Sequence, residues 1–470
     1  MQGKFIATFT ATIAAFALAG CAMAEPAGSV QPPAQTMGPN PVLAKPDKQL
    51  IPTVHIAPAK GWPEGARPMA AEGLAVAPFA TGLDHPRWIY VLPNGDVLVA
   101  ESNAPPKPAD GKGIKGAVMG MVMKRAGAGV PSANRITLLR DLNGDGVADL
   151  RSTFLQNLNS PIGMALVGNT FYVANSDGIV SFPYTPGQTQ ITVAPTTLAE
   201  LPAGPINHHW TKNIIASADG SKLYATVGSN SNVGENGIVA EQGRAAIWEV
   251  SLPTGKSRVF ATGLRNPNGM AWGPGGALWT VANERDELGN DLVPDYLTSV
   301  TDGAFYGWPY SYYGQNVDVR VKPQRPDLVA KAVAPDYALG SHVAALGLAS
   351  SDGAALPAPF AGGFFIGEHG SWNRKPRSGY AVVFVPFGGA AKPTAQPIPV
   401  LTGFVSDKGN AYGRPVGVAI DKRGALLVAD DVGNVIWRVT SARAAVTAAG
   451  TTAATPTSVP VERSGASPAR

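Results

Sequence analysis

The chain has 470 residues, enough for two or three average domains or for one large closed β architecture. With 45% hydrophobic residues the chain is too apolar to be disordered as a whole. Only 15% of the residues are charged, and the 55 glycines and 42 prolines predict many turns, which excludes a surface rich in helices. The net charge is +4, and the sequence has no run of Lys and Arg long enough to form a phosphate-binding stripe. We therefore expect no nucleic acid partner.

The first 24 residues have the pattern of a secretory signal. Lys4 precedes an apolar run from Phe5 to Ala19 and then small residues, so we expect an exported, periplasmic protein. The only cysteine, Cys21, follows Leu-Ala-Gly, which resembles a bacterial lipoprotein signal and predicts a lipid anchor as the one membrane contact. Cleavage after Ala24, which would discard Cys21, is the alternative. Beyond this segment no stretch approaches the roughly 18 apolar residues of a membrane span, which excludes a multi-span membrane protein.

Three further segments follow along the chain. Residues 25–72 are rich in proline and predict a tether or an extended wrap over the domain. We expect residues 73–440 to form the main folded domain, where the candidate catalytic residues described below lie, and residues 441–470 to form a low-complexity tail of Ala, Thr, Ser and Pro.

A loose repeat runs through residues 73–440. Each unit has an apolar opening, often Gly-Leu-x-x-Pro, then a strand, a glycine turn and a second strand. Six units begin near Gly82, Leu158, His209, Gly263, Leu346 and Gly413. Short strands with hairpin turns and no helical period predict an all-β fold, a six-bladed β-propeller, with a two-domain β-sandwich as the alternative. Long loops on one face of such a ring are where we expect the site.

The loop from Asp141 to Asp149 is a candidate calcium site. Asp141, Asn143 and Asp145 place oxygen side chains at alternate positions around a glycine turn, as a hard cation requires. Ser152 stands where an EF-hand has its bidentate glutamate, so a metal-free hairpin rich in Asp and Asn is the alternative.

Two of the unit openings carry candidate catalytic groups. His209 opens the third unit, where an imidazole could act as a general base, or could be a hydrogen-bonded structural histidine. Arg265 and Asn266 hold the equivalent place in the fourth unit, where they could stabilise an oxyanion and orient a polar ligand. A surface arginine paired with an acid is the alternative for Arg265.

The segment 283–295 packs five acids and two amides into thirteen residues, among them Asp286 and Glu287. Such density is costly unless a cation or an arginine offsets it. The chain has only six histidines, and the adjacent pair His208 and His209 would point to opposite sides of a strand. We therefore expect no transition-metal site.

Five motifs together resemble one family. They are Leu264–Ala271, Asn283–Asp286, Tyr306–Pro309, Gly367–Arg374 and Gly413–Gly417. Over residues 73–440 the chain resembles the soluble pyrroloquinoline quinone (PQQ)-dependent sugar dehydrogenases, and within them the L-sorbosone dehydrogenase-like group.

The resemblance implies PQQ and Ca²⁺ on one face of the propeller. It implies that His209 is the catalytic base, and that Arg265 with Asn266 contacts the quinone. Arg414 matches one cofactor-binding arginine, Val416 replaces the second, and Arg374 or Arg377 substitutes for a lysine. Backbone carbonyls of the loop with Asp286 and Glu287 would hold the Ca²⁺.

The implied reaction is oxidation of a sugar, an aldose or a sugar aldehyde such as sorbosone, by hydride transfer to the quinone. The electrons would pass to an exported acceptor such as a cytochrome or a quinone. Two other interpretations remain open on the residues alone. One is a metal-dependent lactonase-like propeller hydrolase, and the other is a non-catalytic binding propeller.

Overall fold

The computed structural model describes residues 30–47, 53–106 and 120–442. The predicted signal segment, Cys21 and nearly all of the predicted tail lie outside the described residues. No helix in the described part is long and apolar enough to cross a membrane.

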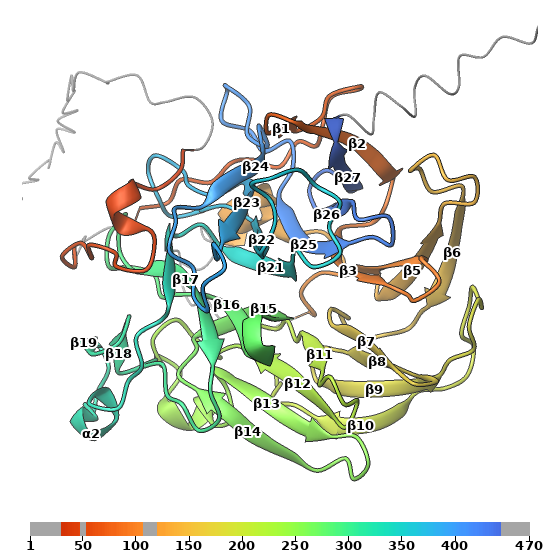
Figure 1. Cartoon of the computed structure of the whole chain (residues 1–470). Coiled ribbons are helices and arrows are strands. Elements are labelled where there is room, and N and C mark those ends of the chain that lie inside the picture. Colours follow the sequence, from red (N-terminus) through yellow and green to blue (C-terminus); the bar gives the residue numbers. More distant parts are fainter. Residues whose placement is uncertain (1–29, 48–52, 107–119, 443–470) are drawn as a thin grey trace, which may run out of the picture.

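Six antiparallel sheets are arranged as a ring, which confirms the predicted six-bladed β-propeller (Figure 1). The first sheet consists of β3 (Pro86–Val91), β4 (Val97–Glu101), β5 (Arg135–Arg140) and β6 (Leu150–Leu155). The second consists of β7 (Met164–Val167), β8 (Thr170–Ala174), β9 (Gly178–Pro183) and β10 (Thr196–Glu200). The third consists of β11 (Ile214–Ala216), β12 (Lys222–Val227), β13 (Ala246–Ser251) and β14 (Ser257–Thr262).

The remaining three sheets complete the ring. The fourth consists of β15 (Asn266–Trp272), β16 (Leu278–Asn283), β17 (Pro294–Val300) and β20 (Tyr337–Ser341). The fifth consists of β21 (Ala345–Ser350), β22 (Gly363–Glu368), β23 (Ala381–Pro386), β24 (Ile398–Thr402) and the short β1 (Met69–Ala70). The sixth joins β25 (Pro415–Ile420), β26 (Leu426–Asp430) and β27 (Val435–Ser441) to β2 (Leu74–Thr81).

The sixth sheet closes the ring with strands from both ends of the domain. Its outer strand β2 pairs with β27 from Leu74 opposite Ser441 to Thr81 opposite Val435. Pairing between strands that are far apart in the sequence ties the first and last units together, so the ring has no free first or last sheet.

The core lies between neighbouring sheets, which explains why the middle strands are apolar on both sides. All five residues of β4 are buried, because each face of its sheet packs against another sheet. Between the first two sheets, for example, Phe154 and Phe171 meet edge to face with ring centroids 5.5 Å apart. Burial of apolar side chains of this kind is the main favourable contribution to folding.

The inner strands approach each other so closely at the centre that they require glycine. A Cβ on Gly269 would lie 2.5 Å from the backbone nitrogen of Leu348. A Cβ on Gly347 would overlap the carbonyl oxygen of Val416 in the next sheet. Because the inner strands lie so close together, the loops that lead into them from successive sheets meet near the centre of the ring.

The proline-rich residues before β1 lie against the ring. The backbone nitrogen of His55 donates to the carbonyl oxygen of Trp372, and the indole of Trp62 donates to Asp430 at 2.7 Å. Trp62 also packs against Phe404 and Trp437. These contacts hold the described part of the segment against the ring.

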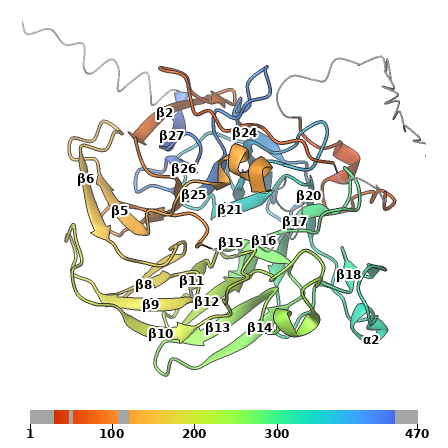
Figure 2. The ribbon, with the colours of Figure 1, turned by 180° about the vertical axis from the view of Figure 1, so that it is seen from behind.

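The helices and remaining strands are short insertions in loops. They are η1 (Ala34–Thr36), η2 (Lys124–Ala128), η3 (Ile238–Glu241), η4 (Pro274–Gly276), α2 (Pro326–Val329) and the hairpin β18 (Ser311–Tyr312) with β19 (Asn316–Val317). Figure 2 shows η2, in orange, lying close to the middle of the ring on one face. The same face of the ring is hollowed by a cavity.

Candidate active site

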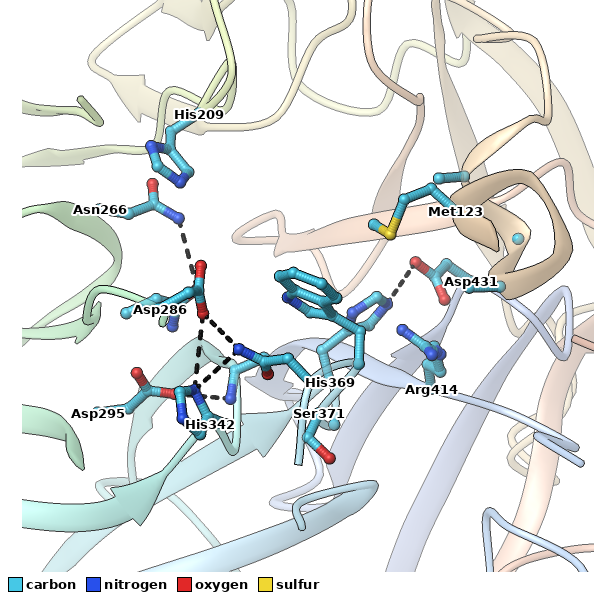
Figure 3. A pocket seen from close by; sticks show the side chains of 18 of the residues that line it. Met123, His209, Asn266, Asp286, Asp295, His342, His369, Ser371, Arg414 and Asp431 are labelled. Atoms are coloured by element: carbon cyan, nitrogen blue, oxygen red, sulfur yellow. Dashed lines mark hydrogen bonds and ion pairs between the residues drawn. The ribbon is translucent and has the colours of Figure 1, made fainter. Parts of the chain in front are cut away.

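A cavity of about 240 Å³ opens among the loops on one face of the propeller. Residues from the first, third, fourth, fifth and sixth sheets line it, together with the helical segment before and within η2 (Figure 3). Five of the residues singled out in the sequence line it: His209, Arg265, Asn266, Asp286 and Arg414. The ring therefore brings together groups that are as far as 205 residues apart in the chain, from 209 to 414.

His209 lies just before β11, and its ring is fixed by the loop after β12. Its Nδ1 lies 2.9 Å from both the carbonyl oxygen and the hydroxyl of Ser229. That hydroxyl donates its proton to the carbonyl oxygen of Ser231, so it can only accept from His209. Nδ1 must therefore carry the proton, which leaves a lone pair on Nε2.

Burial lowers the pKa of His209 well below its ordinary value of 6.5, and the nearby positive charge of Arg265 lowers it further. The imidazole is consequently neutral at pH 7. A neutral ring with an unprotonated Nε2 beside a cavity is equipped to accept a proton.

The Arg265 guanidinium is held on several sides at the base of β15. It donates to the carbonyl oxygen of Glu284 at 2.7 Å, to the side chain of Asn232 at 2.9 Å and to Asp286 at 3.2 Å. The residue is 5% exposed. The alternative for Arg265 was a surface arginine paired with an acid. The acid partner, Asp286, is present, but Arg265 is buried and not on the surface.

Asn266 follows directly and lies against His209. A Cβ added to Gly228 would contact both His209 and the Asn266 amide oxygen, so these two side chains are held beside the same glycine. The amide nitrogen of Asn266 is 3.4 Å from Asn283, but its amide oxygen is buried and has no partner among the described residues. The oxygen is therefore available to a ligand.

Asp286 forms the next corner of the cavity. Asn373 donates to its carboxylate at 2.8 Å, and His342 Nδ1 lies 3.6 Å away. Burial opposes the charge, yet His342 and Arg265 lower the pKa of Asp286 to about 2. The carboxylate is ionised at every pH of interest.

The same corner contains a carboxyl group with the opposite behaviour. Asp295 accepts hydrogen bonds from the backbone nitrogens of Glu284 and Ala344, at 2.8 and 2.7 Å. Burial raises its pKa to about 7. Two carboxyl groups of one cavity thus differ in protonation because their hydrogen-bond partners differ in charge.

The predicted calcium ligands are only partly in place. The carbonyl oxygen of Asp286 accepts from Arg320 at 2.9 Å and from Asn232 at 3.4 Å, and Glu287 does not line the cavity. No three His, Cys, Asp or Glu residues of the described chain gather in a metal-binding arrangement. That search concerns side chains, and the backbone ligands at Asp286 and Glu287 stay a prediction.

Arg414 lies directly before β25 and reaches the cavity from the sixth sheet. Its backbone nitrogen donates to Asp430 and its guanidinium donates to the Tyr380 hydroxyl, each at 2.8 Å. The guanidinium also lies 4.9 Å from the centre of the Tyr380 ring. Val416, two residues on, is 1% exposed and does not line the cavity.

A second charged centre, which the sequence did not single out, surrounds Asp431. Its carboxylate lies 2.5 Å from Arg87, 2.9 Å from Nε2 of His369 and 3.5 Å from Nε2 of His85. Burial opposes ionisation, but His369, His85 and Arg87 keep the pKa of Asp431 far below its usual range. Arg87 thereby brings a further guanidinium into the cavity, in addition to those of Arg265 and Arg414.

The repeat itself contained a signal for part of this centre. His85, Asn266 and Arg414 each stand directly before the proline of their units, and all three line the cavity. Aligning the units at that proline would have identified His85 together with Asn266 and Arg414, which the sequence had already singled out. Asp431 and His342 follow strands and have no such marker.

Two predicted sites lie away from the cavity lining. Arg374 donates to Asp291 at 2.7 Å and to the carbonyl oxygen of Asn290 at 3.1 Å, so it fixes the acidic loop. Asp141 accepts from the backbone nitrogens of Gly144 and Gly146 at 2.7 and 2.9 Å and pairs with Arg423.

The other two residues of that hairpin also bond within it. The amide of Asn143 donates to Asp145 and Asp149, each at 3.2 Å. The loop from Asp141 to Asp149 thus satisfies its oxygens with its own backbone, its own amide and one arginine. The second calcium site stays a prediction.

Several buried polar atoms around the cavity have no partner among the described residues. They are Arg87 Nε, Asn266 Oδ1, Glu284 Oε1, Asn373 Oδ1, Arg414 Nε and Asp431 Oδ1. Unpaired buried polar groups cost free energy, so their gathering at one cavity indicates a place prepared for a polar ligand. Trp372 adds an aromatic ring to the lining.

Comparison with known proteins gives the following matches. The family model described as TrAA12-like matches residues 68–295 and 322–442. An uncharacterised protein of Borreliella burgdorferi is 27% identical over 297 residues, 61% of this chain and 77% of that protein. A pyrroloquinoline quinone-dependent pyranose dehydrogenase of Coprinopsis cinerea is 24% identical over 362 residues, 67% of this chain but only 44% of that protein.

Two solved structures show the same fold. The holo form of the PQQ domain of the Coprinopsis cinerea pyranose dehydrogenase has a TM-score of 0.63 at 22% identity, over 82% of this chain and 100% of that one. The calcium structure of a family AA12 carbohydrate-active enzyme from Trichoderma reesei has a TM-score of 0.64 at 18% identity, over 84% of this chain and 100% of that one.

Proposed function

This chain belongs to the TrAA12-like family, and on that premise we propose that it is a PQQ-dependent oxidoreductase that oxidises a sugar. The observation that carries the proposal is the shared cavity. It holds an imidazole fixed as a proton acceptor, His209, in the same cavity as the guanidinium groups of Arg87, Arg265 and Arg414. The substrate we propose is an aldose or a sugar aldehyde such as sorbosone, as in the L-sorbosone dehydrogenase-like group.

The cavity fits a polycyclic acid such as PQQ. Arg87 and Arg414 each present a buried Nε with no partner among the described residues, and the carboxylates of the cofactor are the natural acceptors for them. Asn266 offers its amide group, and Trp372 offers an aromatic face. Arg87 supplies a third guanidinium to the cavity, whereas Val416, at the position of the second arginine of the glucose enzymes, does not line it.

When bound, PQQ supplies the quinone that accepts the hydride. The chain's own residues handle the proton and the charge. Nε2 of His209 takes the proton of the sugar hydroxyl, while the carbonyl oxygen of Ser229 holds Nδ1–H and orients the ring. Arg265, fixed by Glu284 and Asn232, stabilises negative charge that develops on an oxygen next to it.

Calcium has no step in this mechanism, because the carbonyl oxygen of Asp286 is engaged with Arg320 and Asn232. We retain the ion as a proposal on the resemblance and on the calcium structure of the Trichoderma reesei enzyme. Export to the periplasm, the lipid anchor at Cys21 and a cytochrome or quinone as electron acceptor are likewise proposals. They rest on residues 1–24 and on the resemblance.

Reconstitution tests the proposed function. The purified protein is loaded with PQQ and Ca²⁺ and mixed with a redox dye and a panel of aldoses and sugar aldehydes. We expect dye reduction that requires both PQQ and a sugar. Hydrolysis of sugar lactones without PQQ, with no dye reduction, would instead support the lactonase-like alternative.

A further inference from the structure

A second histidine of the cavity has the geometry of an acid–base group. His369 follows β22, and its backbone nitrogen is fixed by the carbonyl oxygen of Ala344 at 2.9 Å. Its ring meets Asp431 on the side of the cavity away from His209, as Figure 3 shows. In the mechanism proposed above, His209 accepts the proton of the sugar hydroxyl, and His369 has no role.

The contact with Asp431 fixes which nitrogen of His369 carries the proton. Asp431 is ionised and buried, and Arg87 holds the same carboxylate oxygen, so Nε2 of His369 donates to it at 2.9 Å. The lone pair is then on Nδ1. Nδ1 has no hydrogen-bond partner in the described part of the chain, and the side chain, 19% exposed, borders the cavity.

The charges around the two histidines differ. His209 has Arg265 as its strongest charged neighbour, which disfavours an added proton. Burial lowers the pKa of His369 to about 4, but Asp431, directly after β26, raises it. Arg414, directly before β25, and Arg87, in β3, lower it further. The direct hydrogen bond to a carboxylate orients its ring and would stabilise an imidazolium, as in an aspartate–histidine pair.

The proposed reaction releases two protons per turnover. Oxidation of a sugar C–OH to C=O removes one proton from oxygen and one hydride from carbon. The hydride leaves later as two electrons and one proton, when a one-electron acceptor such as a ferricenium dye takes the electrons singly. His209 accounts only for the first proton.

We propose that Nδ1 of His369 accepts the second proton, with Asp431 as the positioning residue that stabilises the resulting imidazolium. The bond that holds this hydrogen on the reduced quinone breaks, the proton bonds to Nδ1, and the two electrons go one at a time to two molecules of the acceptor. The imidazolium then loses a proton to solvent. This inference rests on the proposed function.

Rapid mixing separates the two protons. PQQ-loaded protein is first reduced by sugar without a dye, and the reduced protein is then mixed with the dye. H369Q should slow the second phase by about 100-fold, and H209Q should slow the first by about as much. H208Q is the matched control, because His208 is exposed and does not line the cavity, and both phases should stay within about two-fold. If H369Q leaves the second phase at the wild-type rate, the proposal is wrong.

Two further measurements test the integrity of the variant and the tautomer of the ring. PQQ binding to H369Q, followed by quenching of tryptophan fluorescence, should match the wild type, which excludes misfolding. Nitrogen-15 spectra of histidine-labelled protein without PQQ should show His369 protonated at Nε2 only, and D431N should disturb that pattern. Protonation of His369 at Nδ1 in the wild type would overturn this proposal, whether or not a sugar reduces the protein. Failure of every sugar to reduce the PQQ-loaded protein would instead count against the proposed function.

Discussion

The Arg265 guanidinium lies 3.2 Å from the Asp286 carboxylate, and both groups border the cavity that contains His209. The carboxylate partly balances the positive charge that would otherwise repel a proton on the imidazole, since Asp286 raises the pKa of His209 while Arg265 lowers it more strongly. The strength of His209 as a base thus depends on two residues contributed by the neighbouring sheet.

Replacing His209 by alanine should abolish turnover, by at least about 100-fold in kcat, because the acceptor of the hydroxyl proton is lost. PQQ binding should be largely intact, since the guanidinium groups that fit its carboxylates remain. Dye reduction and a fluorescence titration with PQQ measure the two effects. Activity within a few-fold of the wild type would refute the assignment of His209 as the base.

Replacing Arg265 by glutamine should raise the pKa of His209, because after burial the arginine is the strongest influence that lowers it. A base works only when unprotonated, so the acid limb of the pH profile of kcat/KM should move to higher pH. Nitrogen-15 titration of the six histidines, with H209Q for assignment, measures the same shift without activity. A pKa that falls or stays the same would contradict the prediction.

Replacing Asp431 by asparagine should destabilise the fold by about 3–5 kcal/mol at pH 7, because Arg87 would keep its buried charge without a partner. The folded-state pKa of Asp431 is depressed, so its stabilising contribution is present above the unfolded value near 4 and is lost as the pH falls below it. Urea unfolding should therefore show a smaller difference between variant and wild type at pH 3 than at pH 7.

Replacing Glu368 by glutamine should stabilise the protein. Glu368 is fully buried, its carboxylate makes at most a weak contact with Gln31, and burial raises its pKa well above 4.5. A raised folded-state pKa means that stability is lost as the pH rises above the unfolded value, so the gain should be near zero at pH 4 and about 1–3 kcal/mol at pH 8. Thermal melting at the two pH values measures it, and an equal gain at both would be inconsistent with this cause.

Removing calcium should weaken PQQ binding, because the carboxylates of Glu284 and Asp286 line the cavity and would repel the carboxylates of the cofactor without a cation. A fluorescence titration with EDTA in place of Ca²⁺ should give a Kd at least about ten-fold higher. The double variant D141N/D145N should leave that Kd unchanged, because its loop does not line the cavity. An unchanged Kd with EDTA would remove calcium from the proposed function.

The repeat unit made the architecture predictable from the sequence. Hairpins with a glycine turn and apolar strands are local features, and six of them in a row leave a closed ring as the arrangement that buries both faces of each sheet. The pairing of β2 with β27 was not predictable in the same way, because strands separated by more than 350 residues carry no local sign of their partner.

The site was predictable where its residues belong to the repeat. His209, Arg265, Asn266 and Arg414 stand at unit openings, and a ring with six-fold repetition places equivalent positions on the same face. Arg374 is an arginine like Arg265 and Arg414, but it does not line the cavity. Its guanidinium instead pairs with the Asp291 carboxylate of the acidic loop at 2.7 Å.

The sequence by itself determined the strands, the number of units and the face on which polar groups gather, since each of these follows from local turn chemistry and from the periodicity of apolar residues. Only the tertiary structure decided the neighbours of each polar group. It placed Asp431 between Arg87 and His369 and fixed the proton of His209 on Nδ1. The physical reason is that charge, burial and tautomer depend on distances of a few ångströms between side chains from different sheets, and those distances exist only once the ring has closed.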